Sequence, residues 1–199
     1  AKNYRKHAQE LGVLDYHAPE NPVFFIKPST SVIGPGESII YPPIGKHVDH
    51  EAELAIVMGK LSKNLLKDDW MDSVLGFTAA NDLSERILQG QDGSFNGNFT
   101  RAKGFDTFCP LGPIIQTDFE ENPELNIQCF VNNELKQDGN TADMIFSIGE
   151  ILAFVTSIMT LLPGDVVLTG TPEGVGPLVP GDEVHAKIDT IGDLINPVK

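Results

Sequence analysis

The sequence predicts a mainly β (α+β) protein, a single domain over residues 1–199 with a few short helices at its periphery. Short aliphatic runs bounded by Gly, Pro and Asn recur along the chain, as expected for strands joined by tight turns. Only one stretch, which begins at Ser147, has the amphipathic period of a long helix. A chain of 199 residues is large enough to bury one proper core.

The composition is that of an ordinary soluble globular protein, with 41% hydrophobic and 21% charged residues. The net charge of −14 argues against nucleic acid or an anionic membrane as partner, because both require clustered Lys and Arg. No apolar run approaches the roughly 18 residues of a membrane-spanning helix. Cys109 and Cys129 lack paired-ligand spacing and indicate reduced thiols in a cytoplasmic protein. No secretory leader is visible, and an additional strand is expected upstream of Ala1.

The first forty residues predict a short helix and two strands. Residues 3–11 carry apolar side chains on one side and meet a helix-stopping glycine at Gly12. Residues 22–27 (PVFFIK) form a strand candidate that runs into a Ser/Thr/Gly-rich loop. A second strand is predicted over 38–41, where two prolines stop it.

The stretch HVDHEAELAIVMG predicts a strand after His50, because large aliphatic residues alternate with small ones. Side chains two apart on a strand share a face, so Glu51 and Glu53 stand side by side. Two such carboxylates repel each other, and burying them unpaired is costly. Mg²⁺ removes the problem, because it takes carboxylate oxygens and keeps positions for water or substrate. An exposed strand end with solvated acids fits this stretch equally well.

The remaining strands are numerous and short. They are predicted over residues 74–81, 111–117, 126–131, 134–137, 166–169, 181–188 and 191–198. Helical structure is predicted as a turn over 67–73, a short helix over 83–89, and an amphipathic helix of about four turns that starts at the capping-box pair Ser147 and Glu150. Residues 90–100 (GQDGSFNGNFT) are polar and rich in Gly and Asn, so we expect a mobile loop that acts as a lid.

Several other polar residues lie where chemistry is often found. His7 and Glu10 are three apart on the first helix, so the carboxylate can orient the imidazole as a general base; a surface ion pair is the alternative. Asp82 ends a strand, which positions a carboxylate rigidly, unless it only caps the next helix. Lys103 is a candidate cation for the acidic cluster, or else a surface lysine. The Gly/Pro-rich loop around Thr171 can offer a hydroxyl and backbone N–H groups to an anionic substrate.

The succession of Glu51-x-Glu53, Asp82-Leu-Ser, Lys103 and Thr169-Gly-Thr171-Pro resembles the fumarylacetoacetate hydrolase family. The pieces FFIKPST, HEAELAIVMGK, KGFDTFCPLGP and GDVVLTGTPEGVGPL are also similar to that family, and the likeness covers nearly the whole chain. It is strongest to small members such as acylpyruvases, oxaloacetate decarboxylases and hydroxymuconate-type isomerases. The resemblance implies a mixed β-sandwich roll, usually a homodimer.

The resemblance also implies the metal site and its surroundings. Mg²⁺ or Mn²⁺ would be held by Glu51, Glu53 and Asp82. Lys103 and Thr171 would contact the substrate, a small 2-oxo acid.

The His7–Glu10 segment is similar to the lid helix that carries the water-activating pair of acylpyruvases. Arg86 and Gln89 match positions that approach substrate in relatives. The chain reads Glu-Arg-Ile-Leu-Gln after Asp82-Leu-Ser, where many relatives have an Arg-Asp pair ahead of the Gln. Substrate choice is therefore not carried over.

The function implied is Mg²⁺-dependent hydrolysis of a C–C bond in an acylpyruvate-like 2,4-dioxo acid. The metal would stabilise the pyruvate enolate that forms when the C3–C4 bond breaks, and His7 would activate the attacking water. Decarboxylation of oxaloacetate would need only the enolate stabilisation. Two alternatives stay open: an isomerase of aromatic catabolism acting on 5-carboxymethyl-2-hydroxymuconate or 2-hydroxyhepta-2,4-diene-1,7-dioate, and a metal-stabilised binding protein without catalysis.

Overall fold

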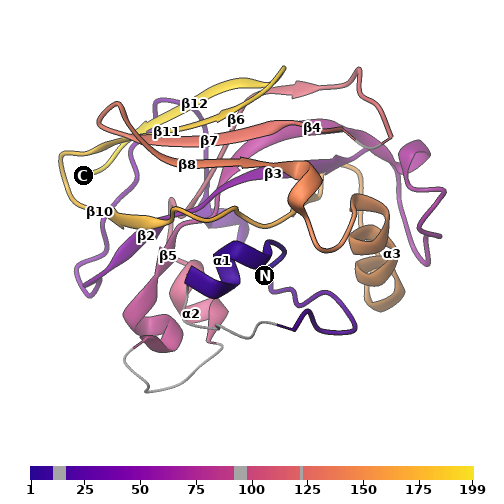
Figure 1. Cartoon of the computed structure of the whole chain (residues 1–199), viewed down its shortest axis with the longest axis horizontal. Helices are drawn as coiled ribbons and strands as arrows, with labels where there is room; N and C mark the ends of the chain where they lie inside the picture. The colour runs from indigo at the N-terminus through magenta and orange to yellow at the C-terminus, as the bar shows by residue number, and fades with distance from the viewer. Residues whose placement is uncertain (11–16, 92–97, 122) are drawn as a thin grey trace.

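A computed structural model describes residues 1–10, 17–91, 98–121 and 123–199 of the chain. The described strands form sheets of five, four and three strands, and the two larger sheets pack against each other (Figure 1). The described helices are short and lie outside these sheets (Figure 1). The predicted mainly β fold with short peripheral helices is therefore confirmed. None of the described helices combines the length and apolar character needed to cross a membrane.

The five-stranded sheet carries the strand on which the site is built. Its strands, in spatial order, are β1 (Val32–Ile33), β6 (Cys109–Gln116), β4 (Val74–Asn81), β3 (Ala52–Met58) and β9 (Val166–Leu168). Strand β3 is buried along its whole length, as its run of aliphatic residues predicts. Leu54, Ile56 and Met58 belong to the hydrophobic core, so the alternate face of β3 is left for Glu51 and Glu53.

The four-stranded sheet covers the core side of β3 and β4. Its order is β12 (Gly192–Pro197), β11 (Glu183–Ile188), β7 (Asn126–Val131) and β8 (Glu134–Asn140), all antiparallel. Strands β7 and β8 form the predicted hairpin, and both turn residues, Asn132 and Asn133, have positive φ. Asparagine tolerates this conformation better than most residues, which explains the turn. Ile127 and Cys129 point into the core shared with the five-stranded sheet.

The small sheet and the helices surround the polar face of β3. The sheet consists of β10 (Gly176–Leu178), β2 (Val48–His50) and β5 (Ser84–Glu85). The α-helices are α1 (Arg5–Glu10), α2 (Phe99–Lys103) and α3 (Ile148–Ile158), and the short turns are Ser29–Ser31, Met71–Ser73, Ile87–Gln91 and Thr141–Asp143. Helices α1 and α2 lie on the same side of the molecule as β5 (Figure 1).

Three elements of the N-terminal half differ from the sequence prediction. Residues 22–27 pair with no described strand; Phe24 instead packs against Phe154, and the lysine that ends the segment reaches the site. Residues 38–41 contribute only an isolated bridge between Ile39 and Val198. The helix predicted over 83–89 is wrong at its start, because β5 pairs there with β2 before the chain turns. Only in the third case does strand pairing between distant segments override the local pattern, whereas the first two segments lack, among the described residues, the neighbouring strand that their pattern would need.

Two further predictions are partly met. The capping box at Ser147 is present, but α3 ends at Ile158 after three turns, because Leu161 pairs with Ser62 in a β-bridge. Within the predicted loop 90–100, residues 99–100 belong to α2 and residues 92–97 lie outside the described part of the chain, so the lid stays a prediction. Leu11, the predicted last residue of the first helix, also lies outside it.

The contribution of the capping box to the stability of α3 can be tested by mutation. Ser147 Oγ accepts the Glu150 N–H, and Glu150 Oε2 accepts the Ser147 N–H. We expect Ser147→Ala to lower the free energy of unfolding by about 1 kcal/mol, because the Glu150 N–H loses its side-chain acceptor. Urea denaturation measures the change. Ser157→Ala, at an exposed serine near the other end of the helix, should stay within about 0.5 kcal/mol of the wild type; an equal loss in both variants would contradict the cap.

Candidate active site

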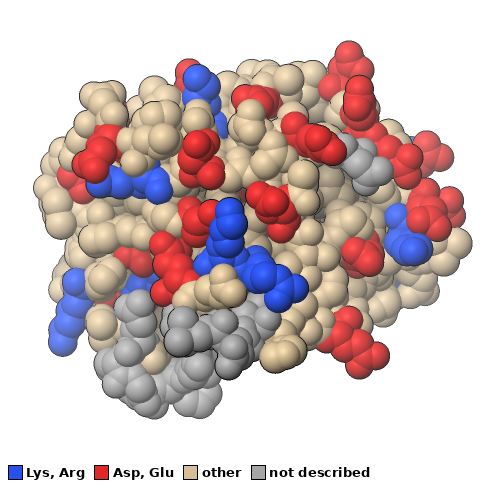
Figure 2. Space-filling model, in the orientation of Figure 1, with Lys and Arg blue, Asp and Glu red and all other residues tan. Residues whose placement is uncertain are grey.

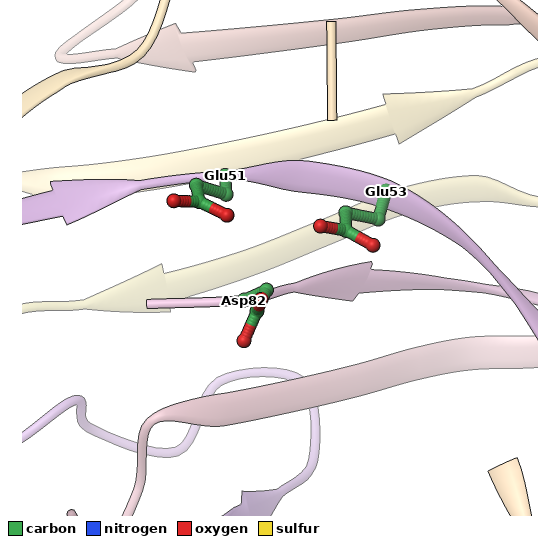
Figure 3. Close-up of side chains that lie close together, drawn as sticks. All are labelled: Glu51, Glu53 and Asp82. Carbon is green, nitrogen blue, oxygen red and sulfur yellow. The ribbon is translucent and has the colours of Figure 1, made fainter. Parts of the chain in front are cut away.

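The three acidic residues predicted as metal ligands lie together on the polar side of β3 and β4. Antiparallel pairing sets Ala52 opposite Asn81, so Glu51 and Asp82 face each other just beyond the paired ends, and the Asp82 N–H donates to the Glu51 carbonyl at 2.8 Å. Glu53 follows two residues along the same face. One carboxylate oxygen from each of the three lies within 4.8 Å of the others (Figure 3). All three residues are buried, which overturns the alternative of a solvated strand end.

Three cations from separate segments surround two of these carboxylates. Lys103 Nζ lies 2.8 Å from Glu51 Oε2 and 2.6 Å from Asp82 Oδ2. Lys27 Nζ lies 2.7 Å from Asp82 Oδ1, and Arg86 Nη2 lies 2.6 Å from Glu51 Oε1. The alternative of a surface lysine is therefore wrong for Lys103, which is only 3% exposed. Lys103 also sits over an aromatic ring, with its Nζ 5.1 Å from the ring centre.

The pKa values of Glu51 and Glu53 are shifted in opposite directions. Burial alone raises the pKa of Glu51, but the charges of Lys103 and Arg86 outweigh it and hold that pKa well below its usual range. Burial raises the pKa of Glu53 to about 8, with the negative charges of Asp82 and Glu51 adding to the shift. In the absence of a cation, Glu53 is therefore mostly protonated at neutral pH.

This donor set fits a hard divalent cation. It consists of carboxylate oxygens alone, which Mg²⁺ and Mn²⁺ prefer. Among the described residues, Glu53 has no salt-bridge partner, and its Oε2 accepts only the Gly170 N–H at 2.6 Å. A dication placed among Glu51, Glu53 and Asp82 would take the place of the proton that Glu53 otherwise holds.

Arg86 is buried in the site and bonds to Asp49, Glu51 and Gln89, which the sequence alone does not indicate. Its side chain is 1% exposed, and Nε donates to Asp49 Oδ2 at 2.7 Å while Nη2 pairs with Glu51. Its Nη1 donates to Gln89 Oε1 at 2.9 Å. Arg86 and Gln89 both line the cavity, but the guanidinium is already engaged by carboxylates. Their predicted contact with substrate stays a prediction; in the structure Arg86 orients Glu51 and Gln89.

The two residues of the predicted His–Glu pair lie beside each other on α1. His7 Nδ1 lies 3.5 Å from Glu10 Oε2, too long for a good hydrogen bond, and among the described residues it has no hydrogen-bond partner. The His7 side chain is 5% exposed and faces the cavity, so a surface ion pair does not describe it. Burial raises the pKa of Glu10, but its contact with His7 and the Gly174 N–H, which donates at 3.0 Å, lower that pKa overall.

A cavity of about 510 Å³ joins these groups and extends to apolar residues near the end of α3. The predicted site residues that line it are His7, Glu51, Glu53, Asp82, Arg86, Gln89, Lys103 and Thr171. The Thr171 hydroxyl donates to the Ala52 carbonyl at 2.8 Å and accepts from Gln137 Nε2 at 2.7 Å. Its proton is thus held by the backbone of β3, and its contact with substrate stays a prediction.

Sequence reasoning missed two contributors to the carboxylate cluster. Lys27 ends the apolar run PVFFIK, and a lone cation directly after two aromatic residues was the available signal. Ser84 places Oγ 2.9 Å from Glu51 Oε1 and belongs to the Asp82-Leu-Ser motif that carried the family resemblance. The surface gives less information, because Asp and Glu are scattered over the visible face with Lys and Arg among them (Figure 2).

The fold is a β-sandwich with three buried carboxylates and a His–Glu pair at one cavity. These features are those of a class of proteins that can hold a divalent cation. The chain belongs to the fumarylacetoacetate hydrolase family, because the family model described as fumarylacetoacetate (FAA) hydrolase C-terminal matches residues 1–199. The resemblance seen in the sequence is thereby confirmed.

Relatives within this family differ in the reactions for which they are named. The chain is 44% identical over 205 residues to a mitochondrial oxaloacetate tautomerase of Rattus norvegicus, covering 98% of this chain and 64% of the relative. The crystal structure of 5-carboxymethyl-2-hydroxymuconate delta-isomerase from Mycobacterium smegmatis is 45% identical, with a TM-score of 0.87 over 100% of this chain and 76% of that chain.

A fumarylpyruvate hydrolase from Pseudomonas aeruginosa, solved in complex with Mn²⁺ and pyruvate, is 29% identical with a TM-score of 0.91. The match covers 99% of this chain and 86% of that chain. The family is thus one of enzymes, and at least one relative binds a divalent metal. The homodimer implied by the resemblance stays a prediction.

The raised pKa of Glu53 predicts how the metal-free protein responds to pH. Its pKa is about 8 in the folded chain against an ordinary value of 4.5, so the folded state binds this proton more tightly. The stability contributed is fully present below about pH 4.5 and is lost as pH rises through 8. In EDTA, we expect the melting temperature of the wild type to fall between pH 5 and pH 9 relative to that of Glu53→Gln, which cannot titrate.

The matched control is Glu134→Gln, at an exposed glutamate on β8, which should follow the wild type across the range. A constant difference between wild type and Glu53→Gln at all pH values would contradict the raised pKa. Because both variants remove one carboxylate, the comparison separates burial in the cluster from a general loss of negative charge.

Proposed function

We propose that the protein is a metal-dependent enzyme that hydrolyses a C–C bond in a small 2,4-dioxo acid of the acylpyruvate type. The observation that carries the proposal is the position of His7, a buried imidazole that faces the same cavity as the carboxylate cluster and is held beside Glu10. A cluster of carboxylates alone would serve a metal-binding scaffold equally well. The buried His–Glu pair adds a base, which a scaffold would not need.

Glu51, Glu53 and Asp82 would hold Mg²⁺ or Mn²⁺, and the ion would supply Lewis acidity toward the carboxylate and 2-oxo oxygens of the substrate. Lys103 supports that role with a fixed positive charge. Burial lowers the pKa of Lys103, but the negative charges of Asp82 and Glu51 together outweigh burial and raise that pKa overall. The ammonium therefore stays charged at neutral pH. Lys103 therefore acts as an electrostatic stabiliser of developing negative charge and not as a base.

His7 performs the proton transfers of the proposed hydrolysis. Glu10 orients the imidazole, which removes a proton from water as the hydroxide oxygen bonds to the 4-oxo carbon. The C3–C4 bond then breaks, and its electron pair passes to C3 and is shared with the 2-oxo oxygen. Protonation at C3 yields pyruvate, and the other fragment leaves as a carboxylate. One water is consumed and no oxidant or reductant is required.

Keto–enol tautomerisation or double-bond isomerisation of a 2-oxo diacid is the second candidate. It is favoured by the names of two relatives, the oxaloacetate tautomerase at 44% identity and the hydroxymuconate isomerase at 45%. The same base would move a proton to or from C3 without adding water. Oxaloacetate decarboxylation would use the electrostatic part of the site alone, with CO₂ leaving from C3.

Removal of the base should separate these steps. We expect His7→Asn to lower kcat for acylpyruvate cleavage at least 100-fold with little change in KM, because asparagine cannot take a proton from water. His185→Asn, on strand β11 far along the chain, is the control and should retain activity within twofold. Pyruvate release from acetylpyruvate with Mg²⁺ measures the rate, and undiminished cleavage by His7→Asn would overturn the hydrolytic mechanism.

The two candidates differ in their products. Proton NMR in D₂O, with Mg²⁺ and either acetylpyruvate or oxaloacetate, distinguishes bond cleavage from exchange of deuterium into C3. From acetylpyruvate, we expect the proposed hydrolase to give acetate and pyruvate that carries deuterium at C3, and both products should disappear with EDTA. Metal-dependent exchange at C3 without cleavage of either compound would replace hydrolysis by tautomerisation.

A further inference from the structure

Gln137 is a buried glutamine on a strand that is otherwise open to solvent. Its side chain is 0% exposed, and every other residue of β8 is exposed or half-buried. A buried amide on such a strand is costly unless all of its hydrogen-bonding groups are satisfied. The alternation of a hairpin strand would place an apolar residue here, facing the core, so the amide needs a specific explanation.

The amide of Gln137 is fully satisfied by partners from two other segments. Its Oε1 accepts the Ala52 N–H at 3.0 Å and contacts His50 Nδ1 at 3.0 Å. Its Nε2 donates to Thr171 Oγ1 at 2.7 Å and to the Pro172 carbonyl at 2.9 Å. Since a backbone N–H only donates and a carbonyl only accepts, these partners fix the amide orientation, and His50 must donate from Nδ1.

The residues that Gln137 holds begin a short loop, residues 170–175, which we call the junction loop. This loop reaches both parts of the candidate site through backbone N–H groups. The Gly170 N–H donates to Glu53 Oε2 at 2.6 Å, and the Gly174 N–H donates to Glu10 Oε1 at 3.0 Å. One loop therefore orients a carboxylate of the metal cluster, the carboxylate of the His–Glu pair and the Thr171 hydroxyl.

Close packing places the junction loop directly against β8. A Cβ added at Gly174 would lie 2.0 Å from the Lys136 carbonyl oxygen, and Gly174 has φ of +92°. A Cβ added at Gly139 would lie 2.4 Å from the Pro172 side chain. Glycine is required at both points, because any side chain would push the loop away from the strand. The loop is thus seated on β8 at Pro172 and Gly174, and Gln137 lies between the two points of contact on the strand.

We propose that Gln137 is a positioning residue for the reaction proposed above: it fixes the junction loop and, through it, aligns Glu53, Glu10 and Thr171. The inference rests on the proposed function for its catalytic meaning. Gln137 lies outside the cavity lining and bonds to none of the predicted metal ligands, so it acts through the residues it holds: the junction loop and Ala52, which lies between Glu51 and Glu53. The four-stranded sheet thereby has a part in the site, although it contributes no residue to the cavity wall.

The first test measures the loop itself in the metal-free protein. Gln137→Glu keeps an acceptor for the Ala52 N–H but loses the donors to Thr171 and Pro172. Amide hydrogen exchange, followed by NMR, should be at least tenfold faster at Gly170 and Gly174 in this variant. Amides of the β7–β11 pairing, such as Ile127, should exchange as in the wild type. Unchanged exchange at both glycines would overturn the proposal.

The second test connects the loop to catalysis. Gln137→Glu and Gln137→Met should each lower kcat/KM for the 2-oxo acid substrate at least tenfold in the presence of Mg²⁺. The matched control, Gln128→Met on β7, loses only a bond to Asp138 on the surface and should stay within twofold. If Gln137→Met does not fold, Gln137→Glu carries the test alone, because it retains the contact with β3.

The outcomes separate the two proposals. Faster exchange at the glycines together with activity within twofold of the wild type would overturn the positioning role. A wild type that turns over no 2-oxo acid would overturn the proposed function, while the exchange measurement would still decide whether Gln137 holds the loop. A tenfold loss of activity with accelerated exchange confined to the junction loop supports both.

Discussion

Three buried carboxylates on one sheet face require compensating positive charge, and the surroundings of the site follow from that requirement. Glu51 and Asp82 are compensated by Lys27, Lys103 and Arg86, which come from three separate segments of the chain. Breaking one buried pair would leave an uncompensated charge, which is far more costly than losing a surface pair. The segments that carry these cations therefore close over the cluster, whether or not their local sequence favours regular structure.

Strand β3 links this electrostatic arrangement to the stability of the whole fold. Leu54 and Ile56 face the core between the two large sheets, while Glu51 and Glu53 face the cavity. A shift of one residue in the pairing with β4 would exchange the two faces, burying carboxylates in the core. The same register that packs the core therefore assembles the candidate metal site. This coupling explains how the carboxylates can be held close together without a loop of their own.

The sequence predicted most reliably what depends on local pattern. The alternation in β3, the end of β4 just before Asp82 and the capping box at Ser147 are all short-range signals, and the structure has all three. Elements defined by distant partners were missed: β5 forms because β2 lies beside it, and residues 22–27 stay irregular because they cover the cluster. The pairing of Arg86 with Asp49 likewise depends on folding, since nothing within either segment specifies the other.

The candidate site is divided between buried strands and a short helix. This division offers a physical reason why relatives with the same fold are named for different reactions. The carboxylates sit on β3 and the end of β4, in the most buried part of the sheet, whereas His7 and Glu10 sit on a six-residue helix. In the reaction proposed above, charge stabilisation would use the rigid part, and proton transfer would use the helix. Small changes in how α1 is seated would alter where the base acts without disturbing the carboxylates. In this chain the Gly174 N–H ties Glu10 to the junction loop, so the seating of α1 is set by the same loop that contacts Glu53. The position of the His7–Glu10 pair is thereby coupled to that of the carboxylate cluster.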